Sequence, residues 1–429
     1  MTPPPPELSQ FRIEPQPNGL IHLVFDCPDR SMNVFSNKAI HELGMFADWL
    51  RLSDVRGVVV RSGKPSGFCA GADLTELGTA YDMIVAAAPA TRFDLAFEHF
   101  FPLSHAIRRL ETAGKPVAAA IAGVALGGGC ELTLGCHYRV VTSGKRTILG
   151  LPECAVGLLP GAGGTQRMPR LVGLETGLDV LLLGRNLQGE DALSAGLVHA
   201  VVEEGEEVAA AEAWLLSDTA HCTQPWDRPG ARPLPHSASA AHIAGVRARE
   251  IARMLGHEPA PLAILDCVEL GLMQPMDGAI RSEMAIFARL IQRPEPRNMI
   301  RTMFLGKQAW DKALRAEAMP TEVTQAKERV EALVQDAVAR CPDLRRAGFV
   351  PHDLTLEPAQ TGAGDDFWFT SDDAMLAAVR TLCTEAAVVT GSLSPHQNLL
   401  LDHGLAAAGT IPAYLGGITG LCEASQRAR

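Results

Sequence analysis

Hydrophobic and polar positions along this chain follow two different periods, and the change from one to the other predicts its architecture. Short β-prone apolar runs, typical of buried strands, occur at residues 19–25, 57–60, 117–121 and 138–141. Apolar residues at helical spacing occur between these runs, at residues 37–52, 97–110 and 131–135. Strands that alternate with helices predict an α/β unit with parallel strands, which runs to about residue 205.

The rest of the chain has a mainly helical pattern. A helix predicted at residues 205–217 is followed by a stretch rich in proline and glycine, residues 224–233, which we interpret as a linker. Two amphipathic helices, at residues 297–314 and 321–340, are expected on either side of Pro320.

At 429 residues the chain is too long for one ordinary domain. An irregular acidic stretch at residues 342–372 precedes a further predicted helix at residues 373–386. We expect a core at residues 10–220, a linker with helices that complete the core at residues 221–315, and a helical C-terminal region at residues 316–429.

Composition and charge exclude several classes of function. The hydrophobic fraction of 47% and the charged fraction of 20% are typical of a globular protein. A net charge of -11 without a basic block, and an aromatic content of 5%, argue against nucleic-acid binding as the main activity. No apolar segment reaches the ~18 residues that span a bilayer, and the proline-rich N-terminus is not a signal peptide. We therefore expect a cytoplasmic protein without membrane insertion.

The ten cysteines are scattered along the chain. No pair has Cys-x-x-Cys spacing, so neither a zinc site nor a redox dithiol is indicated. Most lie in apolar contexts, where a small buried hydrophobic residue is expected. A set of disulfides would be unusual in a chain of this size, and free thiols in a reducing cytosol fit better.

Two glycine-bearing turns follow predicted strands and offer main-chain donors. In the first, residues 67–74, small residues let the backbone pass close to a ligand, although a plain strand-to-helix turn with Asp73 near a helix start is the simpler reading. In the second, Gly127, Gly128 and Gly129 open a helix, and amides at the positive end of its dipole suit a developing oxyanion. Close helix packing is the alternative explanation of that triplet.

Two glutamates beside these turns are the candidate base and acid. Glu131 falls in the first turn of the predicted helix, where the alternative is that it only complements the helix dipole. Glu153 lies in an apolar stretch where burial would raise its pKa, and the alternative is a solvent-facing loop residue. Two amide-bearing turns can polarise a thioester carbonyl, while two carboxylates in different environments divide base and acid roles on one water molecule, without a metal.

At these residues the sequence resembles the crotonase family, also called enoyl-CoA hydratases/isomerases, over roughly residues 12–295. The resemblance is carried by Cys-Ala-Gly-Ala-Asp-Leu at residues 69–74, Gly-Gly-Gly-Cys-Glu at 127–131, Leu-Pro-Glu at 151–153 and Pro-Gly-Ala-Gly-Gly-Thr-Gln-Arg at 160–167. It implies an α/β fold, with a crotonase-like ββα spiral core that is followed here by a mostly helical C-terminal region.

The resemblance also implies roles for individual positions. The backbone N–H groups of Ala72 and Gly128 would form the oxyanion hole, Glu131 would activate water as the base, and Glu153 would deliver a proton to the α carbon. The substrate would further be bordered by Ala70, Gly71, Asp73, Leu74, Gly127 and Gly161. Lys64 is a candidate phosphate contact, beside the plainer reading of an exposed lysine. Neither a metal nor a separate cofactor is implied, since coenzyme A is part of the substrate.

Two further segments resemble the hydratase half of bacterial multifunctional fatty-acid oxidation alpha subunits: residues 225–230 and the linker-helix residues 297–305. Those proteins continue into a dinucleotide-binding domain, but residues 300–429 contain no Gly-x-Gly-x-x-Gly turn after a strand. Positions similar in spacing to the end of the helical dehydrogenase domain are Asp402, His403, Gly404, Leu405, Gly409, Pro412, Gly416 and Gly417. We expect a remnant of that domain without its NAD-binding part, and no use of NAD.

One spacing departs slightly from the family pattern. Glu131 and Glu153 are 22 positions apart, and residues 143–147 look like a lengthened turn. A hairpin at that turn would absorb the added length without moving Glu153.

The function that we expect is 2-enoyl-CoA hydratase, with syn addition of water to an enoyl-CoA thioester in fatty-acid or related acyl-CoA metabolism. The alternatives are a Δ3-Δ2 enoyl-CoA isomerase or another crotonase-type lyase, and a non-catalytic acyl-CoA-binding subunit of a thiolase complex. Retention of both glutamates favours hydration. The resemblance implies a homo-oligomer, a trimer or paired trimers, for the core alone; the alternative is that the extra C-terminal helices cover that surface and leave a monomer or dimer, as in the multifunctional relatives. A thiolase partner is expected only for the non-catalytic alternative.

Overall fold

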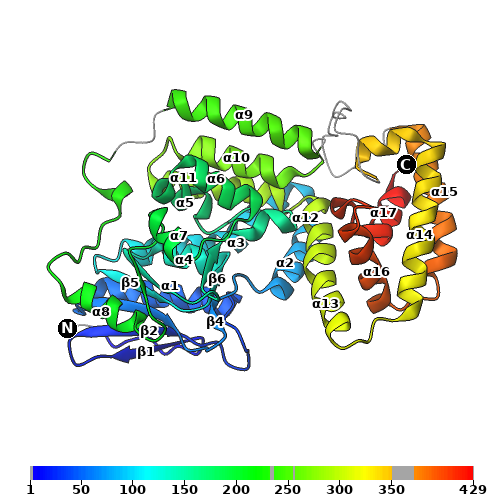
Figure 1. Ribbon diagram of the computed structural model, residues 1–429. Coiled ribbons are helices and arrows are strands. Elements are labelled where there is room, and N and C mark those ends of the chain that lie inside the picture. Colours follow the sequence, from blue (N-terminus) through cyan, green and yellow to red (C-terminus); the bar gives the residue numbers. More distant parts are fainter. Residues whose placement is uncertain (1–2, 232–235, 255–256, 350–371, 429) are drawn as a thin grey trace. The chain divides into compact units, whose positions relative to one another are not determined.

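The computed structural model describes residues 3–231, 236–254, 257–349 and 372–428, and the chain forms two compact units (Figure 1). The first unit comprises Met1–Cys154, Leu159–Ala241 and Ala263–Gln292, and the second comprises Ala155–Leu158, His242–Leu262 and Arg293–Arg429. The boundary at residue 292 lies inside the predicted segment 221–315, so the C-terminal unit begins earlier than the predicted residue 316.

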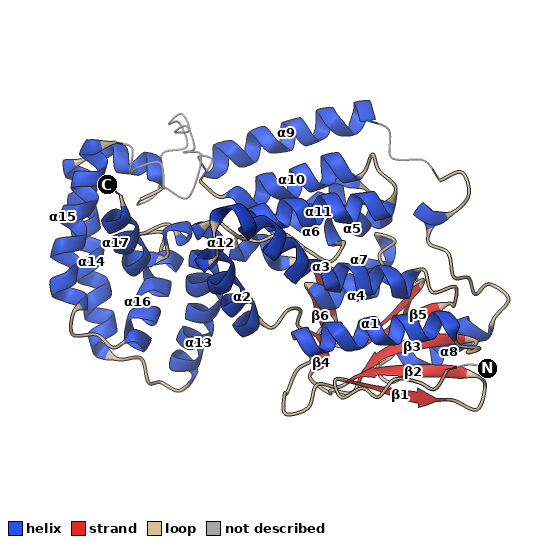
Figure 2. Cartoon of the chain, turned by 180° about the vertical axis from the view of Figure 1, so that it is seen from behind, coloured by secondary structure: helices blue, strands red, loops and turns tan. Residues whose placement is uncertain are grey.

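A six-stranded sheet organises the first unit. In spatial order its strands are β1 (Phe11–Pro15), β2 (Leu20–Phe25), β3 (Gly57–Ser62), β5 (Val117–Ile121), β7 (Tyr138–Thr142) and β9 (Ala200–Val202). β1 and β2 are antiparallel and turn at Gly19, which has a φ of 81° that favours glycine, while the pairs from β2 to β9 are parallel. The predicted α/β class is confirmed. Figure 2, seen from behind, shows β1, β2, β3 and β5 of this sheet in red.

Helix α8 (Glu207–Leu216) covers one face of this sheet. Its Ala211 and Leu215 pack against strand side chains that point to this face of the sheet. Because successive side chains of a strand point to opposite faces, β5 contributes alternate residues, Ala118 and Ala120. The strand residues of this cluster are Leu20, Val59, Ala118, Ala120 and Val140. The predicted helix at residues 37–52 coincides with α1 (Asn37–Leu52).

The remaining helices that lie wholly within this unit are α2 (Leu74–Ala86), α3 (Arg92–Glu111), α4 (Gly128–Gly135), α5 (Gly164–Val172), α6 (Leu174–Leu183), α7 (Gly189–Ser194) and α11 (Met276–Leu290).

A second, three-stranded sheet places the glycine motifs at one edge. Its strands β4 (Gly67–Cys69), β6 (Val124–Leu126) and β8 (Ile148–Gly150) are parallel and lie in the order β4-β6-β8. The segments that follow these strands therefore leave the same edge of the sheet, and they carry the three motifs. β7 and β8 lie in different sheets, so residues 143–147 connect two sheets, and the predicted hairpin there is wrong.

The predicted linker at residues 224–233 begins as a packed segment. Gln224 is buried, and its Nε2 donates to the carbonyl oxygen of Cys136 at 3.1 Å, at the end of α4. Asp227 forms an ion pair with Arg108 of α3, with 2.6 Å between Oδ2 and Nη1. Residues 232–235 lie outside the described residues. The linker prediction is therefore wrong for residues 224–227, which are fastened to the first unit.

The second unit is helical, as predicted for the C-terminal region. Its helices include α12 (Pro294–Met299), α13 (Lys307–Arg315), α14 (Thr321–Arg340), α15 (Asp373–Thr390), α16 (Pro395–Ala407) and α17 (Gly417–Arg427). Helices α9 (His236–Met254) and α10 (Pro259–Gly271) have residues in both units. Among the described helices, none combines the length and apolar character needed to cross a lipid bilayer.

One predicted helix of this unit is interrupted. The predicted helix at residues 321–340 coincides with α14, but residues 297–314 are divided by a π-helical segment, Ile300–Gly306. At Gly306 a Cβ would lie 2.8 Å from the Cβ of His403 in α16, so the segment passes close to that helix. His403 is far from Gly306 along the chain, so local periodicity contains no information about this contact.

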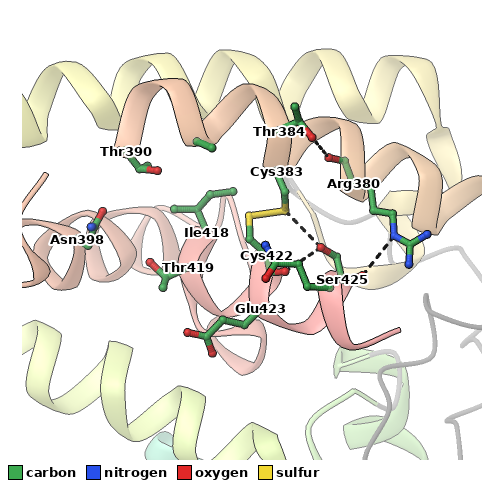
Figure 3. Close-up of a pocket in the computed structure, with 12 residues that line it drawn as sticks. Arg380, Cys383, Thr384, Thr390, Asn398, Ile418, Thr419, Cys422, Glu423 and Ser425 are labelled. Carbon is green, nitrogen blue, oxygen red and sulfur yellow. Dashed lines mark hydrogen bonds between the residues drawn. A yellow bond between two sulfur atoms is a disulfide. The ribbon is translucent and has the colours of Figure 1, made fainter. Parts of the chain in front are cut away.

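Cys383 of α15 and Cys422 of α17 form a disulfide. The two residues are 39 positions apart, so no spacing motif reveals them, and the expectation of free thiols is wrong for this pair. The disulfide lies beside a cavity of about 680 Å³ in the second unit (Figure 3), whose lining includes Arg380, Thr384, Asn398, Thr419 and Glu423.

Candidate active site

The first two glycine motifs meet at the edge of the small sheet. A Cβ on Gly71 would lie 3.5 Å from the backbone N of Gly128 and 3.6 Å from the Cα of Gly127. Gly71 has a φ of 99°, a conformation that side chains disfavour, so both the backbone and the neighbouring turn require glycine here. Two predicted amide-bearing turns are therefore in contact.

A parallel bridge between Phe35 and Ala72 orients the Ala72 amide. The N–H of Phe35 donates to the Gly71 carbonyl at 2.8 Å, and the N–H of Asp73 donates to the Phe35 carbonyl at 3.0 Å. In this pattern the intervening residue directs its own N–H away from the bridge partner. Ala72 is exposed, and no described residue accepts a hydrogen bond from its N–H.

The Gly128 amide is the second unoccupied donor. Gly128 is the first residue of α4, and the N–H groups of a first helical turn have no acceptor within the helix. The preceding N–H, of Gly127, donates to the Gly150 carbonyl at 3.0 Å, whereas no acceptor for the Gly128 N–H lies within the described ranges. Two free amide donors thus lie on adjoining turns.

Glu131 lies in the first turn of α4 and is buried. Its Oε1 accepts hydrogen bonds from the N–H of Ala162 at 2.7 Å and from the N–H of Gly164 at 2.8 Å. Burial raises the pKa of Glu131 to about 7, while these two hydrogen bonds and the charge of Arg167 act in the opposite direction. Its carboxyl group therefore changes charge near neutral pH.

Glu153 follows β8 in the short 3-10 helix Pro152–Val156. Its Oε1 would lie 3.0 Å from a Cβ on Gly127, and its Oε2 is buried without a hydrogen-bond partner in the described part of the chain. Burial, and then the charge of Glu131, raises the pKa of Glu153 well above its usual range. The reading of Glu153 as a solvent-facing residue is therefore wrong, and the two glutamates differ in that only Glu131 is held by neighbouring amides.

Two charged candidates have structural partners. The Asp73 Oδ1 accepts a hydrogen bond from the N–H of Thr75 at 3.0 Å, so Asp73 caps α2, and its other oxygen pairs with Arg30. Lys64 forms an ion pair with Asp26, with 2.7 Å between Nζ and Oδ1, and its side chain is only 16% exposed. The plainer reading of Lys64 as an exposed lysine is wrong, and its ammonium already has an anionic partner.

The remaining predicted substrate contacts are Ala70, Leu74, Gly127 and Gly161. Ala70 is exposed between β4 and Gly71, and Leu74 is partly buried as the first residue of α2. Gly127 separates the free Gly128 amide from the end of β6. Gly161 packs against Phe287 of α11, whose Cδ2 would lie 3.1 Å from an added Cβ. Of these positions Gly127 lies beside the Glu153 side chain, and the roles of all four toward a substrate stay predictions.

Glu283 of α11 is a buried acid that the sequence analysis did not single out. Its carboxylate accepts hydrogen bonds from the N–H of Gly163 at 2.7 Å and from the N–H of Thr165 at 3.1 Å. Burial, and then the charge of Glu131, raises the pKa of Glu283 to about 8. Helical periodicity predicts the burial of this position, because Glu283 lies on the buried apolar stripe of Ala279, Ile280, Met284 and Phe287, but it does not predict the partners of its carboxyl group.

Comparison with known proteins gives the family of this arrangement. The enoyl-CoA hydratase/isomerase family model matches residues 16–223, which contain both turns and both predicted catalytic glutamates. The chain belongs to the crotonase family. The family expected from the four motifs is thereby confirmed.

Relatives of this crotonase include longer proteins. The fatty acid oxidation complex subunit alpha of Idiomarina loihiensis is 35% identical over 288 residues, which cover 66% of this chain and 39% of that protein. The subunit alpha of Shewanella frigidimarina is 32% identical over 326 residues, which cover 73% of this chain and 43% of that protein. The chain thus spans about two fifths of the length of these relatives. A solved structure, a putative enoyl-CoA hydratase from Streptomyces coelicolor A3(2), is 26% identical with a TM-score of 0.46, over 58% of this chain and 89% of that one.

Proposed function

We propose that this crotonase is a 2-enoyl-CoA hydratase, which adds water syn across the double bond conjugated to an acyl-CoA thioester. The observation that supports it most is the different hydrogen bonding of two buried carboxyl groups, those of Glu131 and Glu153. Glu131 is held by two amides and has a pKa of about 7. Burial and the charge of Glu131 raise the pKa of Glu153 well above its usual range, and Glu153 has a buried oxygen without a partner among the described residues. Environments that separate two carboxyl pKa values assign a base and an acid.

In the proposed reaction, ionised Glu131 takes a proton from water while the oxygen attacks the β carbon. The electron pair of the double bond moves toward the thioester oxygen, and the amides of Ala72 and Gly128 stabilise the resulting enolate. Neutral Glu153 then gives its proton to the α carbon, which restores the thioester. One water has been added, and proton exchange with solvent returns both glutamates to their starting states.

Several wider properties belong to this proposal. The curated relatives are named as alpha subunits of a fatty acid oxidation complex, so a role in fatty-acid or related acyl-CoA metabolism is proposed. We propose turnover without a metal and without NAD, and a homo-oligomeric assembly. A thiolase partner is proposed only for the alternative in which the chain binds acyl-CoA without converting it.

The proposal is tested with purified protein and a series of 2-enoyl-CoA thioesters of increasing chain length, with and without NAD. We expect 3-hydroxyacyl-CoA as product, at a rate that NAD does not change. Faster conversion of a 3-enoyl-CoA to its 2-enoyl isomer than hydration of the latter would replace the proposal with isomerisation. Binding of every thioester with no turnover would replace it with the non-catalytic alternative.

A further inference from the structure

The turn at residues 161–165, called the clamp turn below, supplies the hydrogen bonds that hold Glu131. The N–H groups of Ala162 and Gly164 both donate to Glu131 Oε1, at 2.7 and 2.8 Å. A Cβ on Gly164 would lie 2.8 Å from that same oxygen, so the turn and the carboxylate are in direct contact. The position of the Glu131 carboxylate therefore depends on the position of this turn.

The other amides of the clamp turn bind a different carboxylate. The N–H groups of Gly163 and Thr165 donate to Glu283 at 2.7 and 3.1 Å, and the Thr165 hydroxyl also contacts the Glu283 carboxylate. Successive amides of one turn thus alternate between two acids, one from α4 and one from α11. Glu283 and Thr165 are each 0% exposed, so water does not compete for these hydrogen bonds.

The clamp turn has little freedom to reposition itself. Gly163 has a φ of 96°, and an added Cβ there would lie 1.9 Å from Nη1 of Arg167. Gly164 and Thr165 begin α5, so their N–H groups have no acceptor within the helix and rely on the two acids. Losing one acid leaves buried donors without partners, which shifts the turn or destabilises it.

We propose that Glu283 is a positioning residue for the base: by fixing Gly163 and Thr165 it sets where the Ala162 and Gly164 amides hold Glu131. Glu283 needs no contact with substrate for this role. The inference rests on the proposed function and deepens it, because it names a residue on which the geometry of the base depends. An error in the placement of a reacting group of ~1 Å costs ~10²-fold in rate.

The effect of a substitution at Glu283 on the pKa of Glu131 depends on the charged groups around Glu131. The groups that face Glu131 are Cys130 on its own helix, Glu153, Arg167 of α5 and Glu283 of α11. The hydrogen bonds from Ala162 and Gly164 lower the pKa of Glu131, and the charge of Glu131 raises the pKa of Glu283. If the clamp turn shifts and these two hydrogen bonds weaken, the pKa of Glu131 rises.

Two substitutions remove one or both of the Glu283 oxygens that accept hydrogen bonds from Gly163 and Thr165. Glu283→Gln keeps one acceptor oxygen, whereas Glu283→Met keeps the chain length and removes both. The control is Glu42→Gln, because Glu42 is also buried in the first unit and accepts two backbone amides, from Ser9 at 2.9 Å and Gln10 at 2.7 Å. It has no contact with the clamp turn among the described interactions.

Hydration kinetics and a titration are measured on all variants. We expect kcat to fall about 10-fold in Glu283→Gln and about 100-fold in Glu283→Met, with KM changed less than 3-fold, since lost positioning acts on the chemical step. The pH midpoint of the acid limb should rise by about half a unit or more in both variants. Glu42→Gln should lose stability while keeping the wild-type kcat and midpoint.

A readout without turnover separates this inference from the proposed function. In protein labelled with ¹³C at glutamate carboxyl carbons, the signal that Glu131→Gln removes reports the Glu131 titration directly. A raised midpoint in Glu283→Gln supports the positioning role, even if wild-type protein hydrates no enoyl-CoA and the proposed function fails. A Glu131 midpoint and kcat equal to wild type in Glu283→Gln would overturn it, whether or not Glu283→Met folds.

Discussion

The pH dependence of hydration should follow the titration of Glu131. Only its ionised form can take a proton from water, and burial raises its pKa to about 7. At that pKa the ionised fraction is about 9% at pH 6, about 50% at pH 7 and about 91% at pH 8. The rate at subsaturating substrate should therefore rise about tenfold from pH 6 to pH 8. A carboxyl at its ordinary pKa would be ionised throughout this range and give no rise.

The perturbation that tests the assignment is Glu131→Gln. The substituted side chain keeps an oxygen that can accept from Ala162 and Gly164, so we expect a folded protein. Hydration should fall by about 10²–10⁴-fold, because a positioned base is lost. The loss of rate at each pH should be larger at pH 8 than at pH 6, where most wild-type Glu131 is already neutral.

The assay is the initial rate of crotonyl-CoA hydration at subsaturating substrate, from pH 6 to pH 8, for wild type and Glu131→Gln. Unfolding by denaturant at the same pH values controls for stability. A wild-type rate that is flat across this range, or a variant with near-normal hydration, would refute the role of Glu131 as the base.

Three further predictions concern stability. Glu153→Gln should raise the free energy of unfolding, measured by denaturant titration, more at pH 8 than at pH 5. A folded protein loses stability as the pH rises toward the raised pKa of a buried acid, by about 1.4 kcal/mol per unit of pKa shift, and the substitution removes that loss. An equal effect at both pH values would contradict the burial of Glu153. Gly163→Ala should lower the melting temperature, whereas Gly205→Ala, with a similar φ of 95° and open space, should cost less; equal losses in the two variants would show that the contact with Arg167 does not matter. Cys383→Ser should lower the free energy of unfolding of the second unit by up to ~4 kcal/mol, which is the loop-closure entropy that a disulfide over 39 residues removes from the unfolded chain. If wild type and variant still differ in stability by this amount in the presence of a reductant, the difference does not come from the disulfide.

Local patterns predicted the parts of this fold that depend on neighbouring residues. Helix α1 begins and ends where its apolar spacing predicted, and β5 coincides with the apolar run at residues 117–121. The small sheet was not predicted: the two glycine turns were expected to follow the strands at residues 57–60 and 117–121, whereas they follow β4 and β6. Its strands are only three residues long, too short for a period to be read from the sequence.

Long-range partners account for what the sequence did not reveal. Glu283 acts on residues 120 and 118 positions away, so its role depends on a contact that no local motif encodes. Gln224 and the Cys383–Cys422 pair were misjudged for the same reason, because their partners lie far along the chain. Glu153 was recognised as a candidate from its apolar neighbours, but its unpartnered oxygen is a property of the folded site alone.

The most direct test of the proposed chemistry is the conversion of crotonyl-CoA in D₂O, followed by mass spectrometry and NMR of the product. Delivery of a proton to the α carbon and of hydroxide to the β carbon predicts 3-hydroxybutyryl-CoA with a single deuterium at the α carbon. Recovery of unlabelled crotonyl-CoA, or of deuterated enoyl-CoA without a hydroxyl group, would contradict the account.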